Sequence, residues 1–548
     1  MHAPRFAALM VGFGLLVACP AEDAEPESAD TGNDGTGNGE TTTGQTTGSA
    51  EDDGTTTTEV SADSTGGEPA GIPAAGGIGI DYIEANQGIG VRIGADGAWV
   101  GPQDRTAPLA ANRLTLVRVF WRVPEDWTPR EIEGRITFYL ADGTTISSSE
   151  TKMVDGDSFV GSLDETFNFG LQAEEASPGV GYSVELYEVD EAFADPDVTE
   201  PPRLPADEES VLVGVESSNQ KLKIVLVPFS YNDGAGCVTD PDLSEETMQL
   251  YFDKMFQMNP IDTLEFEIHE TLAWNTQLTS LGEINQLLSG MRFDEGAPPE
   301  TYYYGHIDVC GGGIGGAAGL AHGIPVDPTV ENAFQRVSTG VSFAPELSAE
   351  TFVHEVGHSQ GRRHIQCNGE GGFDPSYPEE GGAIGEWGFG VVDFRLRHPT
   401  VTKDYMTYCT PTWVSNFGWN KVWPTIQTLT SWEVADAAPT TTPYGNGSLL
   451  VGLLLEDGKE IWNTVPGGVD PSELTDDMQV EFSAGGRRLA LQGTRVEKLP
   501  GSEDRMVVTP LPPGFDSVDQ MARVVGHQRV DITRSAVSIK HHARTTLR

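Results

Sequence analysis

The chain has 548 residues, of which 83 are acidic and 33 basic, so its formal net charge is −50. This length is sufficient for two to four domains with hydrophobic cores of their own. The charge argues against a nucleic-acid partner, because there is no basic stretch to neutralise phosphates. It suits a protein that works outside the cytoplasm.

The first 19 residues are typical of an export signal, with an apolar run over residues 6–18 that is too short to span a bilayer. The run ends in Leu16-Val17-Ala18-Cys19, which resembles the cleavage box of bacterial lipoproteins. The resemblance implies that Cys19 becomes the lipidated first residue of the mature chain; secretion after ordinary cleavage is the alternative. We therefore expect an extracytoplasmic protein that is attached to the outer membrane or cell surface by lipid alone, or is released.

Low-complexity sequence follows, and then strand-like patterns. Residues 20–72 are rich in Thr, Gly, Ser and acids and lack Lys and Arg, which predicts a disordered acidic tether. Between residues 73 and 218, the segment 114–123 alternates between apolar and polar residues, and the segment 136–140 precedes the turn signal Ala141-Asp142-Gly143-Thr144. The strand patterns predict that residues 73–218 form an N-terminal β-domain of the sandwich type.

Residues 219–435 mix strand and helix patterns. An apolar strand is expected over residues 221–229, and helical spacing recurs over residues 244–258 and 278–291. A further helix is expected to start at Ser348, whose hydroxyl can cap it.

A glycine-rich run, Gly311 to Ala321, precedes that helix. Its small residues are compatible with an edge strand that a substrate backbone approaches closely, and equally with a flexible loop. Two histidines lie near the run, His306 and His322. We expect each to be a core or surface residue, although either could touch a substrate.

The most specific pattern of the chain extends from His354 to His364 and reads H-E-x-x-H-x-x-G-x-x-H. On a helix, His354 and His358 project from the same face. Gly361 falls where the chain must leave the helix with positive φ, so that His364 can return as a third ligand. Three imidazoles and one open position predict a single catalytic zinc ion. Glu355 is then placed to act as general base toward water.

The motif resembles that of the metzincin zinc metallopeptidases, which carry a methionine-containing turn beneath the metal further along the chain. The candidate turn here is Asp404-Tyr405-Met406-Thr407-Tyr408-Cys409. The resemblance implies that Met406 packs beneath the zinc. It also implies that Tyr408 stabilises the oxyanion of the transition state.

A narrower resemblance connects the same region with secreted bacterial metzincins of the mucin-cleaving, StcE-like group. It covers His364, the segment Gly381-Gly382-Ala383-Ile384-Gly385-Glu386-Trp387-Gly388, the turn with Met406, and Trp413-Val414-Ser415. This resemblance implies a protein or glycoprotein substrate.

Apart from Cys19, the chain has four cysteines: Cys237, Cys310, Cys367 and Cys409. An even number in an oxidising compartment predicts two disulfides, for which three pairings exist. Cys367 and Cys409 each lie close in sequence to a residue expected at the zinc. We therefore favour the pairs Cys367–Cys409 and Cys237–Cys310, with free buried thiols as the alternative.

The C-terminal part returns to strands. A helix is expected over residues 413–423 and should end at Pro424. Residues 436–548 then alternate as strands, for example over residues 449–455, and predict a small β-domain. The pair His541-His542 near the end is expected to be an exposed feature of the tail.

Taken together, these patterns predict a multidomain α+β protein in which a metzincin-like catalytic domain (residues 219–435) is flanked by β-sandwich-like domains. The predicted activity is zinc-dependent endopeptidase cleavage of extracellular proteins or glycoproteins. The alternative is a non-catalytic surface adhesin or glycan-binding lipoprotein on the same scaffold. Acidic pairs could bind calcium, but no EF-hand loop supports such a site. The sequence indicates no oligomeric state.

Overall fold

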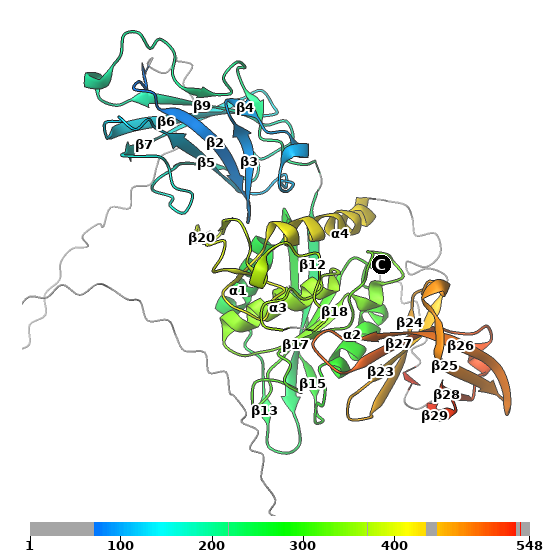
Figure 1. Cartoon of the computed structure of the whole chain (residues 1–548). Helices are drawn as coiled ribbons and strands as arrows, with labels where there is room; N and C mark the ends of the chain where they lie inside the picture. Colours follow the sequence, from blue (N-terminus) through cyan, green and yellow to red (C-terminus); the bar gives the residue numbers. More distant parts are fainter. Residues whose placement is uncertain (1–70, 218, 370, 435–446, 533–536, 539–548) are drawn as a thin grey trace, which may run out of the picture. The chain divides into compact units, whose positions relative to one another are not determined.

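The computed structural model describes residues 71–217, 219–369, 371–434, 447–532 and 537–538 (Figure 1). All of them belong to one compact unit, residues 69–548. The proposed signal peptide, Cys19 and the pair His541-His542 lie outside the described residues. The tether also lies outside them, except at its end. Its predicted end at residue 72 is wrong, because Ile72 is already part of a strand and pairs with Glu188.

The N-terminal region consists of two antiparallel sheets. Their strands are β1 (Ile72–Pro73), β2 (Gly79–Asn86), β3 (Gly90–Ala95), β4 (Ala98–Trp99), β5 (Thr115–Arg122), β6 (Arg130–Tyr139), β7 (Thr145–Val154), β8 (Phe167–Leu171), β9 (Gly181–Glu188), β10 (Arg203–Leu204) and β11 (Val211–Leu212). One sheet has the order β1-β9-β6-β7, with β10 and β11 also on β9, and the other has the order β4-β3-β2-β5-β8. The predicted hairpin is confirmed, since β6 pairs with β7 and Gly143 takes a positive φ.

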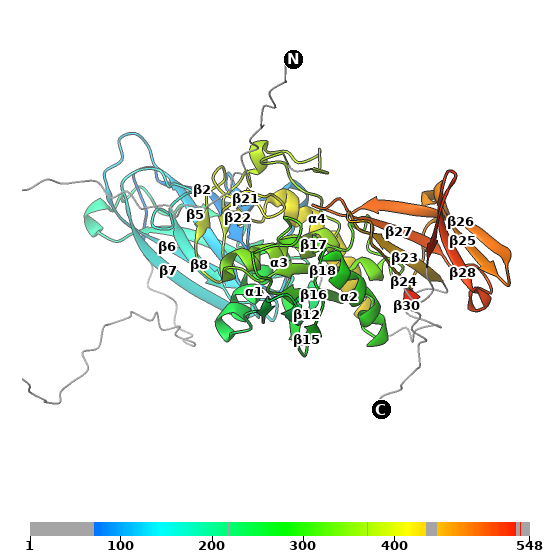
Figure 2. The same ribbon diagram turned by 90° about the horizontal axis from the view of Figure 1, so that it is seen from below.

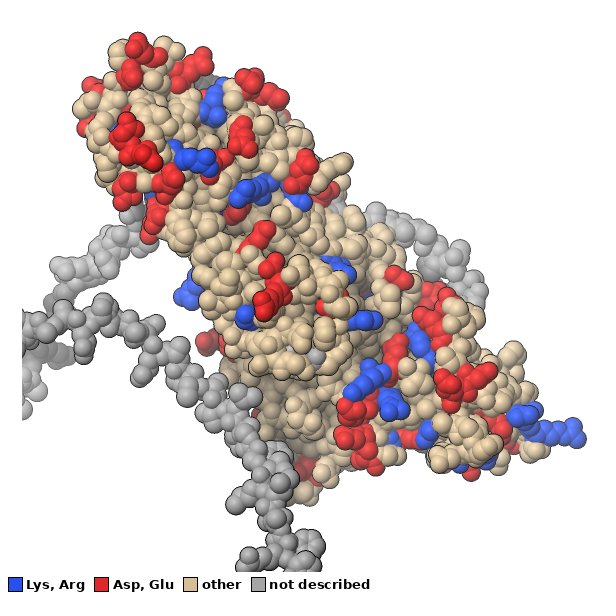
Figure 3. All heavy atoms as spheres, in the orientation of Figure 1, with Lys and Arg blue, Asp and Glu red and all other residues tan. Residues whose placement is uncertain are grey.

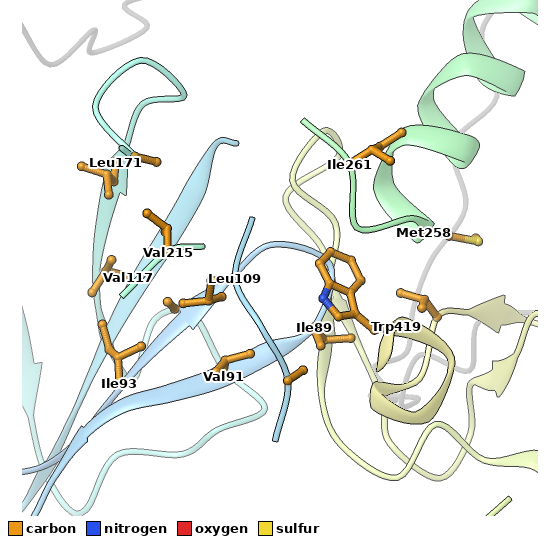
Figure 4. Close-up of a cluster of buried hydrophobic side chains, with 14 of the residues drawn as sticks. Ile89, Val91, Ile93, Leu109, Val117, Leu171, Val215, Met258, Ile261 and Trp419 are labelled. Atoms are coloured by element: carbon orange, nitrogen blue, oxygen red, sulfur yellow. The ribbon is translucent and has the colours of Figure 1, made fainter. Parts of the chain in front are cut away.

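The two sheets share a core, and the alternation of buried and exposed residues is clearest in β6. In β6, Ile132, Ile136 and Phe138 are buried while their neighbours are partly exposed. The buried cluster extends beyond the sandwich to Met258 and Trp419, and Figure 4 shows part of it. A single continuous core therefore joins this region to the one that follows.

The central region is a seven-stranded mixed sheet with four helices. Its strands are β12 (Lys221–Asn232), β13 (Val238–Thr239), β14 (Thr263–Ile268), β15 (Leu272–Trp274), β16 (Tyr302–Ile307), β17 (Gly319–Ala321) and β18 (Val337–Val341). The helices are α1 (Glu245–Met258), α2 (Gly282–Asp294), α3 (Pro345–Ser359) and α4 (Asn416–Val434). The sheet order is β13-β12-β16-β18-β17, with β14 and β15 also on β12. Strand β17 is antiparallel to β18 and lies at the sheet edge.

The helices of this region cover both faces of the sheet. Along β12, Leu222, Ile224 and Leu226 belong to the buried cluster that contains side chains of α1, α3 and α4. Val227 and Phe229 belong to a second cluster, which contains side chains of α2. Figure 2 shows α3 and α1 on one side of β16 and β12, with α2 on the other. The segment that carries His354 and His358 is therefore part of a helix that packs directly on the sheet.

Two helix boundaries differ from their prediction. Helix α3 begins at Pro345 rather than at Ser348, because proline suits the first helical turn, and the Ser348 hydroxyl instead accepts a hydrogen bond from the backbone of Phe343. Helix α4 does not end at Pro424, which lies inside it. Pro424 cannot donate to the carbonyl of Asn420, but both residues are exposed, so water can satisfy that carbonyl.

Four short strands lie between α3 and α4: β19 (Gly388–Phe389), β20 (Leu396–Arg397), β21 (Lys403–Asp404) and β22 (Thr412–Trp413). The C-terminal region contains β23 (Ser448–Leu454), β24 (Glu460–Pro466), β25 (Thr475–Ala484), β26 (Arg487–Lys498), β27 (Arg505–Pro510), β28 (Gln520–Val525), β29 (Gln528–Ile532) and β30 (Val537–Ser538). These form one eight-stranded sheet in the order β29-β28-β25-β26-β27-β23-β24-β30. The strand predicted over residues 449–455 is confirmed as β23.

The surface reflects the composition of the chain. Acidic side chains are spread over the face drawn in Figure 3, with basic ones interspersed among them. Within the described part of the chain, no helix has both the length and the apolar character needed to cross a membrane.

Candidate metal centre

The centre is built on the last two turns of α3 and the loop that follows. His354 and His358 lie one turn apart on this helix and are both buried. Gly361 has φ +91°, as its position predicts, and a side-chain carbon there would lie 2.7 Å from the carbonyl oxygen of Pro325. Because the chain turns sharply at Gly361, His364 comes back toward the helix and is buried beside the other two histidines.

The three imidazoles converge, with one ring nitrogen from each lying within 4.8 Å of the others. The Nδ1 atoms point away, and each is close to a backbone carbonyl oxygen: His354 to Tyr405 at 2.7 Å, His358 to Arg362 at 2.7 Å, and His364 to Gly371 at 3.0 Å. A carbonyl oxygen only accepts, so the protons of the neutral rings are on Nδ1. The Nε2 atoms then carry the lone pairs that can bind a metal ion.

This arrangement fits a bound cation. The Nε2 atoms of His358 and His364 are 3.0 Å apart, and two acceptors facing each other at that distance repel unless positive charge lies between them. Burial, followed by repulsion from the other two imidazoles, lowers the pKa of His358 well below its ordinary value. His358 is therefore neutral, which is the form that binds metals. The three side chains could hold a metal ion.

Glu355 is buried immediately beside the histidines, with 6% of its surface exposed. Burial raises its pKa to about 8, and a hydrogen bond from the backbone of Ala321 acts in the opposite direction. A dication on the histidines would also lower this pKa, because it favours the carboxylate. The Oε2 atom has no hydrogen-bond partner among the described residues. It is therefore available to a water molecule or a substrate.

The role of Gly319 was not anticipated from the sequence. A side-chain carbon at residue 319 would lie 2.5 Å from Cγ and 2.6 Å from Oε1 of Glu355. The glycine of β17 thus makes room for the carboxylate, in addition to any room it leaves for a substrate. The glycine-rich run is compatible with the close approach of another group to this strand. The sequence alone does not indicate that this group is the side chain of Glu355.

The predicted methionine turn lies beneath the histidines. Met406 is fully buried, and a side-chain carbon on Gly357 would lie 2.6 Å from its sulfur, so the glycine of the motif allows the turn to pack against α3. Tyr408 is 56% exposed, and its hydroxyl lies 3.0 Å from Nε2 of His364. The structure thus brings together all of the predicted metal ligands with Glu355, Met406 and Tyr408.

A buried ion pair connects the end of α3 to this turn, and the sequence did not reveal it. Arg362 donates to Asp404 at 3.2 Å, and both side chains are almost completely buried. Asp404 also accepts from the backbone N–H of Met406 at 2.9 Å and from the hydroxyl of Ser415 at 2.5 Å. The backbone carbonyl of Arg362 accepts a hydrogen bond from Nδ1 of His358, so the same residue orients a potential metal ligand and holds the turn in place through Asp404.

Both favoured disulfides are present. Cys367 pairs with Cys409 and joins the loop after His364 to the residue that follows Tyr408. Cys237 pairs with Cys310 and joins the segments that follow β12 and β16.

The remaining candidates lie away from the histidines. Both His306 and His322 are completely buried in the core, and neither lines the cavities at the centre. The glycine-rich run divides: residues 311–318 form turns, and only residues 319–321 form the edge strand β17. Among the described residues, the three histidines are the only cluster of potential metal ligands, so no calcium site is indicated.

A comparison of the chain with protein-family models finds no match, and a comparison with curated protein sequences finds none either. The interpretation of the centre therefore depends on its own geometry.

Proposed function

We propose that this chain is a zinc-dependent endopeptidase of the metzincin type. The observation that carries the proposal is the convergence of three buried, Nδ1-anchored imidazoles next to a buried carboxylate. A zinc ion has a strong preference for such nitrogen ligands, and the three residues that would hold it are His354, His358 and His364. When bound, zinc lowers the pKa of water and polarises a scissile carbonyl.

The protein residues then perform the proton transfers. Glu355 accepts a proton from the attacking water and later delivers it to the leaving amine, for which its free Oε2 atom is suitably placed. Tyr408 lines the cavity beside His364, and its hydroxyl donates a hydrogen bond to the oxyanion. Met406 contributes packing alone, since it is fully buried.

The edge strand β17 suggests how a polypeptide is held. The backbone carbonyl of Ala318 accepts from the N–H of Val341, and the backbone N–H of His322 donates to the carbonyl of Val337, each at 2.8 Å. Backbone groups alternate in direction along a strand, so the N–H and C=O of Gly319 face the open edge. An extended substrate pairs with this edge, and its scissile bond then lies beside Glu355. Extracellular proteins and glycoproteins are the proposed substrates.

The principal test is substitution of the general base. Purified protein should contain one zinc ion, and it should cleave a denatured protein or a mucin until a chelator is added. Glu355→Gln should retain the zinc and the fold but reduce turnover by at least about 10³-fold. His354→Ala should lose both zinc and activity. Normal turnover by Glu355→Gln would rule out the proposed mechanism.

The same experiment separates the enzyme from a binding protein on the same scaffold. A surface adhesin or glycan-binding lipoprotein would bind its target without cleaving it, and Glu355→Gln would leave that binding unchanged. The intact set of ligands and general base favours the enzyme.

The proposed location is extracytoplasmic, and the two disulfides are compatible with it. Anchorage through Cys19 is a separate proposal. Cys19→Ser should abolish incorporation of labelled palmitate and release the protein from membranes, whereas retention of the label would show that another residue is lipidated.

A further inference from the structure

The connection between β26 and β27 belongs to the C-terminal sheet but reaches the metal centre. Lys498 pairs with Arg505 at the end of the ladder, so the loop consists of residues 499–504. It is closed by a backbone hydrogen bond from Leu499 to Asp504 at 3.0 Å, and Lys498 forms an ion pair with Glu503 at 2.6 Å. The loop is therefore a compact turn with a defined tip, Pro500-Gly501.

Both ends of the loop are fixed against the rest of the protein. Leu499 is buried in the cluster that also contains Leu281 and Leu320. The carboxylate of Asp504 is buried and accepts hydrogen bonds from the hydroxyl of Ser280 at 2.5 Å and from the backbone N–H of Glu456 at 3.0 Å. Because these contacts span the central and C-terminal regions, the position of the tip is set by the fold.

The tip lies against the proposed catalytic tyrosine. A side-chain carbon at Gly501 would be 3.0 Å from the hydroxyl oxygen of Tyr408. Gly501 also has φ +68°, a conformation that other residues adopt at a cost. A glycine at this position therefore permits both the turn and its close approach to the tyrosine.

Two cavities meet at this point. One has a volume of about 340 Å³ and is lined by His354 and Glu355, and the other has a volume of about 820 Å³ and extends along the loop. The residues that line both are Ala317, His364, Tyr408, Pro500 and Gly501. The tip of the loop is thus part of the boundary that the two cavities share, next to the metal ligands.

We propose that loop 499–504 is a specificity-determining element that restricts cleavage to a single extended polypeptide strand. The inference rests on the proposed peptidase function. A substrate that occupies both cavities must pass beside the contact between the tip and Tyr408, along the rest of the shared lining, Ala317 and His364. A confined passage of this kind favours an extended chain, because a single strand takes up about 5 Å in a sheet, whereas packed layers of a folded protein are about 10 Å apart. The loop therefore admits flexible segments and excludes compact loops and folded surfaces.

The test uses one peptide sequence in two shapes. The best-cleaved member of a random peptide library is made as a linear peptide and as a cyclic peptide closed by a side-chain bridge across the scissile bond. A shortened variant replaces residues 500–503 with Asn-Gly and keeps the anchors Leu499 and Asp504. It should raise the ratio of kcat/KM for the cyclic peptide to that for the linear one by about tenfold. Pro500→Ala, which trims the tip without shortening the loop, should shift the ratio in the same direction by a smaller factor.

The matched control alters another turn of the same sheet. Gly485→Asn creates the same Asn-Gly turn between β25 and β26, where residues 485 and 486 line neither cavity. It should leave the ratio unchanged. If the shortened variant and Pro500→Ala keep their zinc and melting temperature while the ratio stays within about twofold of the unaltered protein, the loop does not select substrates.

Binding provides a readout that does not require turnover. Each loop change is combined with Glu355→Gln, and the affinity for both peptides is measured by calorimetry. A tighter complex between the shortened variant and the cyclic peptide supports the role of the loop, and unchanged affinities overturn it. Absence of Glu355-dependent cleavage in the unaltered protein would instead count against the peptidase function, so the two failures are distinguishable.

Discussion

At the level of single residues, Gly319 leaves the space that the carboxylate of Glu355 occupies. In Gly319→Ala, the added carbon would overlap Cγ of Glu355, so the carboxylate must move away from the position it now holds. A misplacement of about 1 Å at a catalytic group costs on the order of 10²-fold in rate. We expect kcat/KM of Gly319→Ala to fall by about that factor, with zinc content retained, as measured on a linear peptide.

Gly79→Ala is the control for this substitution, because Gly79 is also a strand glycine but has open space where a side chain would extend. Its activity should match that of the unaltered protein. Full activity in Gly319→Ala would show that Glu355 does not need its present position.

His322 predicts a dependence of stability on pH. Burial lowers the pKa of this imidazole to about 4, from an ordinary value of 6.5. In this range of pH, the unfolded chain binds a proton that the folded chain excludes, so the free energy of unfolding is undiminished above pH 6.5 and decreases as the pH falls toward 4. The loss is on the order of 3 kcal/mol.

Urea unfolding at pH 7 and pH 4.5 checks this expectation. His322→Leu should lose less stability on acidification than the unaltered protein does. His527→Leu is the control, because His527 is exposed in the folded chain. Equal losses in the unaltered protein and His322→Leu would mean that His322 is protonated without cost to the fold.

The residues of the site differ in how far the sequence could predict them. His354, Glu355 and His358 are predictable from the sequence, because residues that are one or four positions apart on a helix lie close together in space. The contributions of Gly319 and Arg362 were not predictable. Gly319 acts on a residue 36 positions away, and Arg362 occupies an unspecified position of the motif. Contacts between distant segments depend on the tertiary fold, which spacing does not encode.

At the level of elements, the ion pair between Arg362 and Asp404 holds the end of α3 against the methionine turn. In Arg362→Met, Asp404 is left as a buried charge without its partner, which costs about 3–5 kcal/mol. The zinc affinity should also fall by about 10–100-fold, because the carbonyl that orients His358 belongs to the same residue. Urea unfolding and a zinc competition assay measure the two effects.

An exposed pair provides the comparison. Arg529 and Asp531 form an ion pair with side chains that are 44% and 77% exposed, so Arg529→Met should cost less than about 1 kcal/mol. A similarly small cost for Arg362→Met would show that the buried pair does not hold the turn in place.

Elements defined by local pattern were predicted well, and their ends less well. Helix α1 is predicted from Ser244 to Met258 and observed from Glu245, with Ser244 as its cap. Helix α4 continues through Pro424 because buried side chains on both sides of it, Trp419 and Ile426, maintain the apolar stripe. In that helix, tertiary packing outweighs the local preference of proline, and no local rule states when this occurs.

At the level of the whole molecule, the sequence predicts domain boundaries at residues 219 and 436. The hydrophobic core continues across both of these boundaries. The N-terminal sandwich and the central region share one buried cluster, and the indole N–H of Trp419 donates to the carbonyl of Pro108 at 3.0 Å. The central and C-terminal regions share another cluster. Composition and periodicity identify each sheet, but they do not indicate which apolar faces are covered by a neighbouring sheet.

The shared cores predict that the C-terminal sheet stabilises the central region. A side-chain carbon at Gly282 in α2 would lie 2.9 Å from Leu453, and Gln286 donates to the carbonyl of Val451 at 3.0 Å, so truncation after Val434 uncovers α2. Truncation of a single buried leucine side chain costs about 2–5 kcal/mol of unfolding free energy. Each kcal/mol lost lowers the melting temperature of a large domain by about 2–4 °C. We therefore expect the truncated protein to melt at least several degrees below the full chain in calorimetry.

Deletion of residues 20–68, which belong to a separate unit, should leave the melting temperature unchanged. A truncated protein as stable as the full chain would show that the two regions fold independently.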